Sequence, residues 1–158
     1  MEGLDGKSTV VTIVPFEWDK HRFEWRDIEN TMEFPWTLRE MKGVLCNGGL
    51  ANAYVAVDQH DKMLGYIFAL PDGKELEIFN LCVRSDKRMT GVGRNLVRHM
   101  ITRARKRRKK NLTVVIRETN LDAQLFFRKQ GFTCVETLKG YYEDHPEEDA
   151  YYFNRELV

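Results

Sequence analysis

Short apolar runs between turn residues mark most of the strands that this sequence predicts. The first run is rich in β-branched residues and stops at Pro15. Three more follow one another in the middle of the chain, and we expect Pro71-Asp72-Gly73 to form the turn between two of them. The predicted strands cover residues 9–14, 53–57, 64–70, 75–83, 112–116, 134–138 and 150–155.

Apolar residues recur at helical spacing in the segments between these strands. We expect Asp19 to cap the first helix and Asn47-Gly48-Gly49 to end the second. In the last helix Leu121, Leu125 and Phe126 are expected to face inward, and Gly131 to follow the helix end. The predicted helices cover residues 19–31, 37–45, 91–108 and 120–130.

The resulting element order, β-α-α-β-β-β-α-β-α-β-β, determines the expected fold class. It predicts a mixed α/β (α+β) sandwich and excludes a doubly wound sheet, which requires repeated βαβ units. A chain of 158 residues is the length of one domain, so residues 1–158 are expected to form a single domain.

Composition and charge narrow the classes of partner and compartment. Hydrophobic residues make up 42% of the chain and charged residues 31%, as in globular proteins, and 25 basic residues nearly balance 24 acidic ones. Global charge therefore predicts no nucleic-acid or membrane partner. No secretory signal or membrane-length apolar run is visible, and three separate cysteines favour reduced thiols in the cytoplasm. The four histidines lack the spacing of metal ligands, so no metal site is expected.

A glycine-containing loop between a predicted strand and a long helix is the most informative segment of the chain. Residues 88–94 read Arg-Met-Thr-Gly-Val-Gly-Arg, and the two glycines stand where the helix begins. The first N–H groups of a helix lack partners and attract anions, so this loop could hold a phosphate. An ordinary strand-to-helix turn remains the alternative. A dinucleotide-binding fingerprint is excluded because no further glycine completes GxGxxG.

Four segments together resemble one known family. Arg88-x-x-Gly91-x-Gly93 resembles the signature of the GCN5-related N-acetyltransferase (GNAT) superfamily. The other three resemble its ribosomal-protein-alanine N-acetyltransferase branch, and the four span most of residues 9–157. These three segments are Phe34-Pro35-Trp36-Thr37, residues 117–132 with Arg117 and Asn120 near their start, and residues 140–150 with Gly140-Tyr141-Tyr142-Glu143.

The resemblance implies acetyl-CoA as co-substrate and a mostly antiparallel sheet of about seven strands, splayed at the cofactor strand. It places the pantetheine arm along one strand and the pyrophosphate over the glycine loop. Asn120 either reaches the cofactor or caps its helix, and Phe127 packs against the thioester. The implied cofactor contacts are Leu81, Cys82, Val83, Arg88, Met89, Thr90, Gly91, Val92, Gly93, Arg94, Asn120 and Phe127.

The catalytic positions depart from the branch that the chain resembles. Val115 stands where the related enzymes have a glutamate base, and Phe127 stands where they have a tyrosine acid. A protonated amine must lose a proton before attack, whereas a thiolate leaves without much help, so the missing base matters more. Glu77 is the candidate base, because histone-type members of the superfamily have a glutamate there. Tyr141 and Tyr142 are the candidate acids.

The acceptor side involves Glu33, Phe34, Trp36 and Tyr141, which the resemblance places beside a peptide groove. The favoured activity is acetylation of a protein N-terminal α-amine, such as that of a ribosomal protein, by direct attack. Two alternatives stay open: an acetyltransferase for lysine or small-molecule amines, and an acetyl-CoA-binding protein with little activity. Glu33 and Glu118 are further competing acids, Glu33 beside the expected peptide groove and Glu118 beside the cofactor loop.

Two charged runs have both structural and functional interpretations. Residues 103–110 carry seven basic side chains at a helix C-terminus, where cations are favourable. The same run leaves open an electrostatic contact with RNA, although direct nucleic-acid binding is not the favoured interpretation. The acidic residues 143–149 are expected to form a solvated loop, or else to attract a cationic peptide.

Overall fold

The computed structural model describes residues 10–46 and 52–157, and within them every predicted strand and helix is present. The element order agrees with the predicted one, with a short 3-10 turn, η2 (Ser85–Lys87), added after the fourth strand. The strands are β1 (Thr12–Pro15), β2 (Ala53–Val57), β3 (Met63–Asp72), β4 (Glu75–Val83), β5 (Asn111–Arg117), β6 (Thr133–Leu138) and β7 (Ala150–Glu156). The helices are α1 (Trp18–Glu29), α2 (Leu38–Cys46), α3 (Val92–Lys106) and α4 (Leu121–Lys129).

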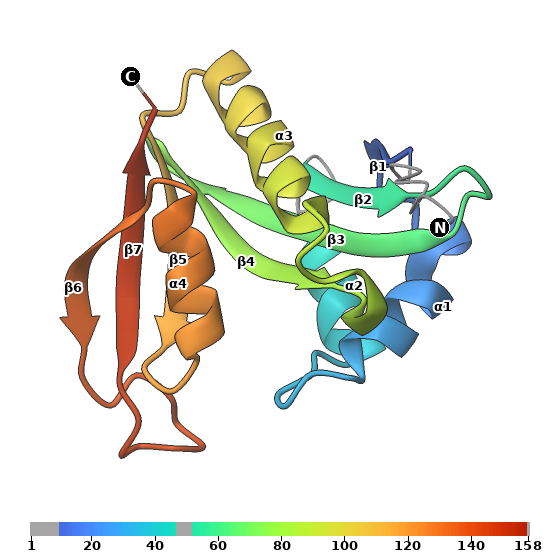
Figure 1. Ribbon diagram of the computed structural model, residues 1–158. Coiled ribbons are helices and arrows are strands. Elements are labelled where there is room, and N and C mark those ends of the chain that lie inside the picture. The colour runs from blue at the N-terminus through green and yellow to red at the C-terminus, as the bar shows by residue number, and fades with distance from the viewer. Residues whose placement is uncertain (1–9, 47–51, 158) are drawn as a thin grey trace, which may run out of the picture.

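The strands form one sheet in the order β1-β2-β3-β4-β5-β7-β6 (Figure 1). All neighbours are antiparallel except β4 and β5, which are parallel. The predicted fold class, a mixed and mostly antiparallel seven-stranded sheet, is therefore confirmed.

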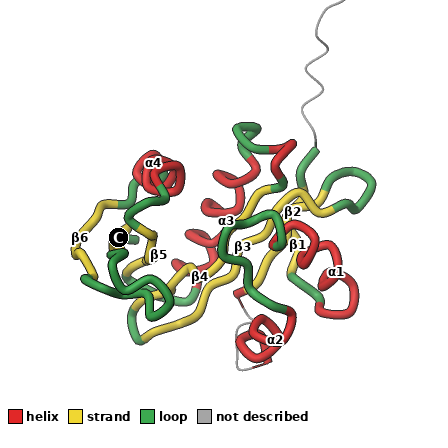
Figure 2. The backbone as a smooth tube through the Cα atoms, turned by 90° about the horizontal axis from the view of Figure 1, so that it is seen from below, coloured by secondary structure: helices red, strands yellow, loops and turns green. Residues whose placement is uncertain are grey.

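The helices cover both faces of the sheet (Figure 2). On one face, α3 and α4 bury an apolar cluster that includes Leu96, Met100 and Phe153. On the other, α1 and α2 bury a second cluster that includes Trp25 and Tyr66. Because successive strand residues point to opposite faces, each central strand contributes to both clusters.

Several local predictions were wrong, and each error has a physical reason. Asp19 lies inside the first turn of α1, whose N-cap is Glu17. β3 continues through Pro71 to Asp72, because Asp72 pairs with Glu75 and leaves a two-residue turn with Gly73 at φ 56°. Leu121 and Leu125 are exposed, since α4 buries the face that carries Phe127. The predicted stop at residues 47–49 lies outside the described residues.

Two further observations concern residues 10–46 and 52–157 as a whole. None of the helices in this part of the chain is long and apolar enough to cross a membrane. No group of three or more His, Cys, Asp or Glu side chains in the same part could hold a metal ion.

Candidate active site

The two parallel strands at the centre of the sheet separate along their length. Their pairing runs from Glu75 opposite Asn111 to Ile78 opposite Val114 and ends there. Beyond that point β4 continues to Val83 and β5 to Arg117, and Figure 1 shows the two strands diverging. The β4 edge that faces β5 at residues 79–83 therefore has no strand partner in the described part of the chain. This is the splay that was predicted, and it contains Leu81, Cys82 and Val83.

The glycine loop presents a row of unused amide groups beside this opening. Gly91 is the N-cap of α3 at φ 93°, and no side chain caps the helix. Within the described residues, the N–H groups of residues 89–94 donate no hydrogen bond, and the first that does is Asn95 N–H, to the Gly91 carbonyl at 3.0 Å. The Met89 side chain is 96% exposed, so the loop is open to solvent. Unpaired amides at a helix start suit a phosphate or pyrophosphate.

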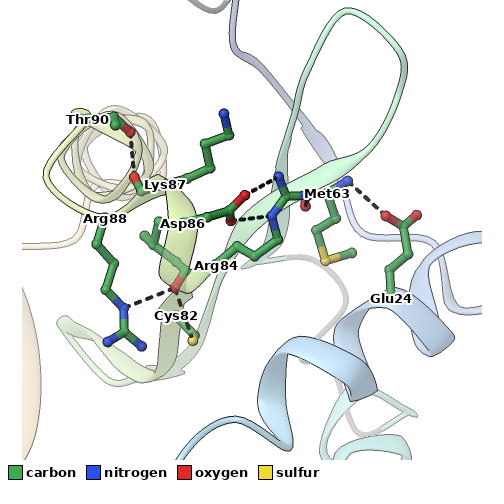
Figure 3. Close-up of polar contacts among 9 residues, drawn as sticks. Glu24, Met63, Cys82, Arg84, Asp86, Lys87, Arg88 and Thr90 are labelled. Atoms are coloured by element: carbon green, nitrogen blue, oxygen red, sulfur yellow. Dashed lines mark hydrogen bonds and ion pairs between the residues drawn. The ribbon is translucent and has the colours of Figure 1, made fainter.

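The basic side chains of the loop are not equivalent (Figure 3). Arg84 donates twice to Asp86, at 2.7 and 3.1 Å, so its charge is balanced within the loop. Arg88 donates to the Val83 carbonyl at 3.4 Å, interacts with the Cys82 thiol, and has no acidic partner among the described residues. Arg88 therefore supplies uncompensated positive charge between the end of β4 and the amide row.

Gly93 permits the two helices on this face to approach each other. A Cβ atom at Gly93 would lie 3.2 Å from the Phe126 ring and 3.5 Å from the Val83 side chain. The second glycine of the motif is thus required by packing between α3 and α4, whereas the first provides the left-handed backbone conformation of Gly91. Sequence analysis predicted that Phe126 faces inward but found no sign of this contact.

Asn120 and Phe127, predicted near the cofactor, both lie at α4. The Asn120 side chain accepts a hydrogen bond from the Ala123 amide at 3.2 Å and caps the helix, which confirms its structural role. Phe127 is 4% exposed and packs against Phe132 in the cluster under α3 and α4. Any contact of either residue with the cofactor stays a prediction.

Glu77 lies on the face of the sheet that carries α1 and α2, opposite Thr113 on β5. The side chain is half-buried, and within the described residues its carboxylate has no hydrogen-bond partner. Burial raises its pKa, and the nearby carboxylates of Asp72 and Glu75 raise it further. Such a group is protonated more readily than an exposed glutamate, as a general base acting near neutral pH requires.

A polar pair that the sequence did not reveal lies next to Glu77. The Tyr152 hydroxyl on β7 donates to the Glu75 carboxylate at 2.6 Å, and burial together with this bond raises the Tyr152 pKa. Tyr152 is paired in register with Val115, at the position where related enzymes have a base. Only the tertiary pairing of β5 with β7 reveals this proximity.

Phe34, a predicted acceptor residue, and Tyr142, a candidate acid, both contact one guanidinium group. The Cζ atom of Arg117 lies 3.8 Å from the ring centroid of Phe34 and 3.7 Å from that of Tyr142. The Arg117 side chain also donates to Glu148 at 2.7 Å, and Thr119 donates to the same carboxylate at 2.6 Å. These bonds lower the Glu148 pKa, with the Thr119 bond as the largest cause. The loop before α2 and the loop between β6 and β7 are therefore joined at the end of β5.

This arrangement corrects the expectation that residues 143–149 form only a solvated loop. Glu148 is 8% exposed, and Asp149 accepts hydrogen bonds from the Gly140 amide and from Lys139. The carboxylate of Glu118, predicted as a competing acid, accepts a hydrogen bond from the Asp149 amide at 3.0 Å. Its carboxylate thus has a structural role in the loop.

The remaining predicted residues differ in their surroundings. Tyr142 is half-buried, and burial raises its pKa to about 12, whereas Tyr141 is 50% exposed and lies edge-on to it. Trp36 packs edge-on against Phe79 of β4, with ring centroids 5.6 Å apart. Glu33 is exposed and has no polar partner among the described residues. The structure therefore brings Phe34, Trp36 and Tyr142 to the site but gives Glu33 no specific contact.

Glu29, a buried carboxylate that sequence analysis missed, supports this acceptor side. It is 2% exposed and accepts hydrogen bonds from the Trp36 amide at 3.0 Å, from the Asn80 side chain at 3.2 Å and from the Tyr66 hydroxyl. One side chain on α1 thus connects the loop before α2 to β3 and β4. The only sequence signal was an acidic residue on the otherwise inward-facing side of a helix.

Cys82 lies on β4, the strand predicted to hold the cofactor, and its thiol is not activated. It is buried beside Met32, with the two sulfur atoms 3.3 Å apart, and burial raises its pKa. A thiol with a raised pKa stays protonated and is a poor nucleophile. The site therefore favours direct transfer over an acetyl-cysteine intermediate.

Comparison with known proteins agrees with this geometry. The model of the acetyltransferase (GNAT) family matches residues 11–132. The ribosomal-protein-S18-alanine N-acetyltransferase from Escherichia coli is 25% identical, with a TM-score of 0.79 over 94% of this chain and 95% of that one. Ard1 from Thermoplasma volcanium is 21% identical, with a TM-score of 0.83 over 94% and 98% of the two chains. Nourseothricin acetyltransferase is 24% identical, with a TM-score of 0.63 over 67% and 65%.

A search of curated protein sequences gives no significant match. The family model nevertheless spans most of the chain, and the fold and the open glycine loop agree with it. The chain therefore belongs to the GNAT family of acetyltransferases, enzymes that transfer an acyl group from acetyl-CoA.

Proposed function

We propose that this protein transfers the acetyl group of acetyl-CoA to the N-terminal α-amine of a protein, such as a ribosomal protein. The observation that carries the proposal is the opening between β4 and β5, flanked by the free amides of residues 89–94 and by the Phe34–Arg117–Tyr142 stack. The opening and its free amides suit the acyl donor, and the stack encloses the acceptor. The 25% identity to an alanine N-acetyltransferase over 94% of the chain supports a peptide acceptor.

In the proposed reaction the chain holds the donor at two places. The amides of the loop and Arg88 bind the pyrophosphate, and the main-chain groups of Leu81, Cys82 and Val83 align the pantetheine arm. An amide N–H near Val83 stabilises the oxyanion that develops on the acetyl group. All of these contacts require backbone geometry more than particular side chains.

Proton transfer is assigned to side chains on the α1–α2 face of the sheet. Glu77 accepts one proton from the ammonium group, and the neutral amine nitrogen then bonds to the acetyl carbon. The carbon–sulfur bond breaks to release the thiolate. Tyr141 or Tyr142 binds the peptide, and the second proton that the nitrogen loses passes through this tyrosine to the thiolate. A thiolate with an ordinary pKa near ~8.5 leaves without strong acid assistance, so replacement of the family tyrosine by Phe127 is tolerated.

The experiment is release of free thiol from acetyl-CoA with short peptides that differ in their first residue. A peptide with a lysine and a blocked N-terminus and a set of small amines serve as parallel acceptors. We expect turnover only where the α-amine is free. Turnover confined to lysine or small amines would change the acceptor class, and acetyl-CoA binding without turnover on any amine would contradict the proposal.

The role of Glu77 is tested separately by the pH dependence of kcat/KM. A base must be deprotonated, so kcat/KM falls as the pH drops below the pKa of the base. Because the pKa of Glu77 is raised, this acidic limb of the pH profile should lie at a higher pH than for an ordinary glutamate. Glu77→Gln should remove the limb, whereas the matched variant Glu33→Gln should retain it. Full turnover of Glu77→Gln at every pH would exclude Glu77 from the mechanism.

The three cysteines indicate the compartment of the protein. Cys46 and Cys134 are exposed, Cys82 is buried, and all three are free thiols. Free exposed thiols suit a reducing compartment, so we place the protein in the cytoplasm.

A further inference from the structure

A basic groove of about 1090 Å³ lies between α3 and the C-terminal strands of the sheet. Among the described residues, its lining includes five cations from three elements and one acidic side chain. The charged residues of this basic groove are Arg94, Arg98 and Arg105 on α3, Lys129 at the end of α4, and Arg155 and Glu156 on β7.

This groove is separate from the site for the acyl donor. Of the residues predicted to contact the cofactor, only Arg94 lines it. Gly93 packs against Phe126 where α3 begins, and the groove lies along α3 from Arg94 to Arg105. The acetyl-transfer reaction therefore leaves most of this surface without a role.

The groove carries a net positive charge, and its cations are not held in ion pairs within the described residues. Within residues 10–46 and 52–157, none of its five cations forms an ion pair with a carboxylate. Arg155 donates to the Gln130 carbonyl and Arg105 to the Leu157 carbonyl at 3.4 Å. Neighbouring cations without counter-charges repel one another, and a bound polyanion would relieve that repulsion.

The arrangement of the cations indicates the class of anion. Arg94, Arg98 and Arg105 follow one side of α3, and at about 1.5 Å per residue they form a row about 16 Å long. Such a row matches several successive phosphates better than one small anion, and guanidinium groups bind phosphate oxygens in pairs. No aromatic side chain is among the lining residues, so the groove has no platform on which bases could stack.

We propose that the basic groove binds the phosphate backbone of double-helical RNA, without reading its sequence. Thr133 adds a hydroxyl group to the lining, and Thr102, whose hydroxyl donates to the Arg98 carbonyl at 3.1 Å, adds an acceptor oxygen. Both can hydrogen-bond to ribose 2′-hydroxyls, which DNA lacks. The basic run that continues from Arg103 to Lys110 extends the positive surface beyond the end of α3. The enzyme would thus be held on a folded RNA while its active site stays free.

The test is fluorescence anisotropy of a labelled RNA hairpin with the full chain in saturating acetyl-CoA. The triple variant Arg98→Ala/Arg105→Ala/Lys129→Ala removes three groove cations and spares Arg94. The control Arg39→Ala/Lys42→Ala/Lys62→Ala removes the same charge from exposed positions outside the groove. We expect the groove variant to bind RNA about tenfold more weakly or worse, and to lose about 2 from the slope of log K against log salt. The control should change little.

Four results would overturn the proposal. Equal weakening in both triple variants would mean non-specific attraction, and displacement of the RNA by acetyl-CoA would make the groove part of the donor site. Equal affinity for a DNA duplex would remove the preference for RNA, and equal affinity for polyglutamate would indicate an acidic protein partner. Acetylation of a short peptide should be unchanged in the groove variant, which shows that it is folded. Arg98→Glu, with a single reversed charge, provides a second test if the triple variant does not fold.

Discussion

Replacement of Glu29 by alanine should destabilise the whole acceptor side of the molecule. The change leaves three donors without their acceptor: the Tyr66 hydroxyl, the Trp36 amide and the Asn80 side chain. Tyr66 is fully buried, so its unsatisfied hydroxyl costs about 1–3 kcal/mol. The other two donors are partly buried, and each adds about 1 kcal/mol. The expected loss is therefore about 3–5 kcal/mol, a large part of the ~5–15 kcal/mol typical of a folded domain.

Urea denaturation of the wild-type protein and of Glu29→Ala measures this loss in the free energy of unfolding directly. Glu24→Ala is the matched control, because Glu24 is also an α1 glutamate but accepts, within the described residues, a single hydrogen bond, from the Met63 amide at 2.9 Å. Glu24 is exposed, so water can replace its carboxylate, and we expect a loss of about 1 kcal/mol or less. If Glu29→Ala were no less stable than Glu24→Ala, the argument from buried donors would be refuted.

Two further variants, Tyr66→Phe and Glu29→Gln, measure the coupling between the two side chains and its effect on activity. Tyr66→Phe removes one of the three donors and leaves Glu29 in place. A double-mutant cycle of Glu29→Gln with Tyr66→Phe gives the coupling between the two side chains, expected at about 1–3 kcal/mol. Because Trp36 and Asn80 belong to the acceptor side and the cofactor strand, kcat/KM should fall for both substrates. A coupling near zero would show that the two groups act independently.

Three further predictions concern single residues. Gly91→Ala forces a side chain into the left-handed region and should cost about 1 kcal/mol or more while raising the KM for acetyl-CoA, as steady-state kinetics and denaturation would show. Burial lowers the pKa of His21, so the folded state resists its protonation, and stability should decline as the pH falls below about 6.5 in thermal melts. A flat profile would contradict this. Arg117→Lys keeps the charge but loses planar stacking on two rings, so the acceptor KM should rise with the acetyl-CoA KM unchanged.

The helices and strands of this protein, and the glycine loop of the proposed donor site, could be predicted from local sequence. Apolar residues at helical spacing identified α3, and the same local rules identified Asn120 as a cap and Gly91 as the point where a helix begins beside a strand. These features depend on the conformational preferences of neighbouring residues, so they are encoded within a few positions of one another. Family resemblance then connected them to acetyl-CoA.

The contacts that form the proposed acceptor site depend on the tertiary structure. Glu29 meets Asn80 across 51 positions, Tyr152 meets Glu75 across 77, and Arg117 stacks between two loops far apart in the chain. The inward face of α4 was also set this way, since Leu121 and Phe127 are both apolar and only the packing against α3 and the sheet selects which is buried. Local sequence determines where a chain forms turns and helices, but strand register and helix packing determine which distant side chains meet. In this protein those contacts bring together the residues of the proposed acceptor site.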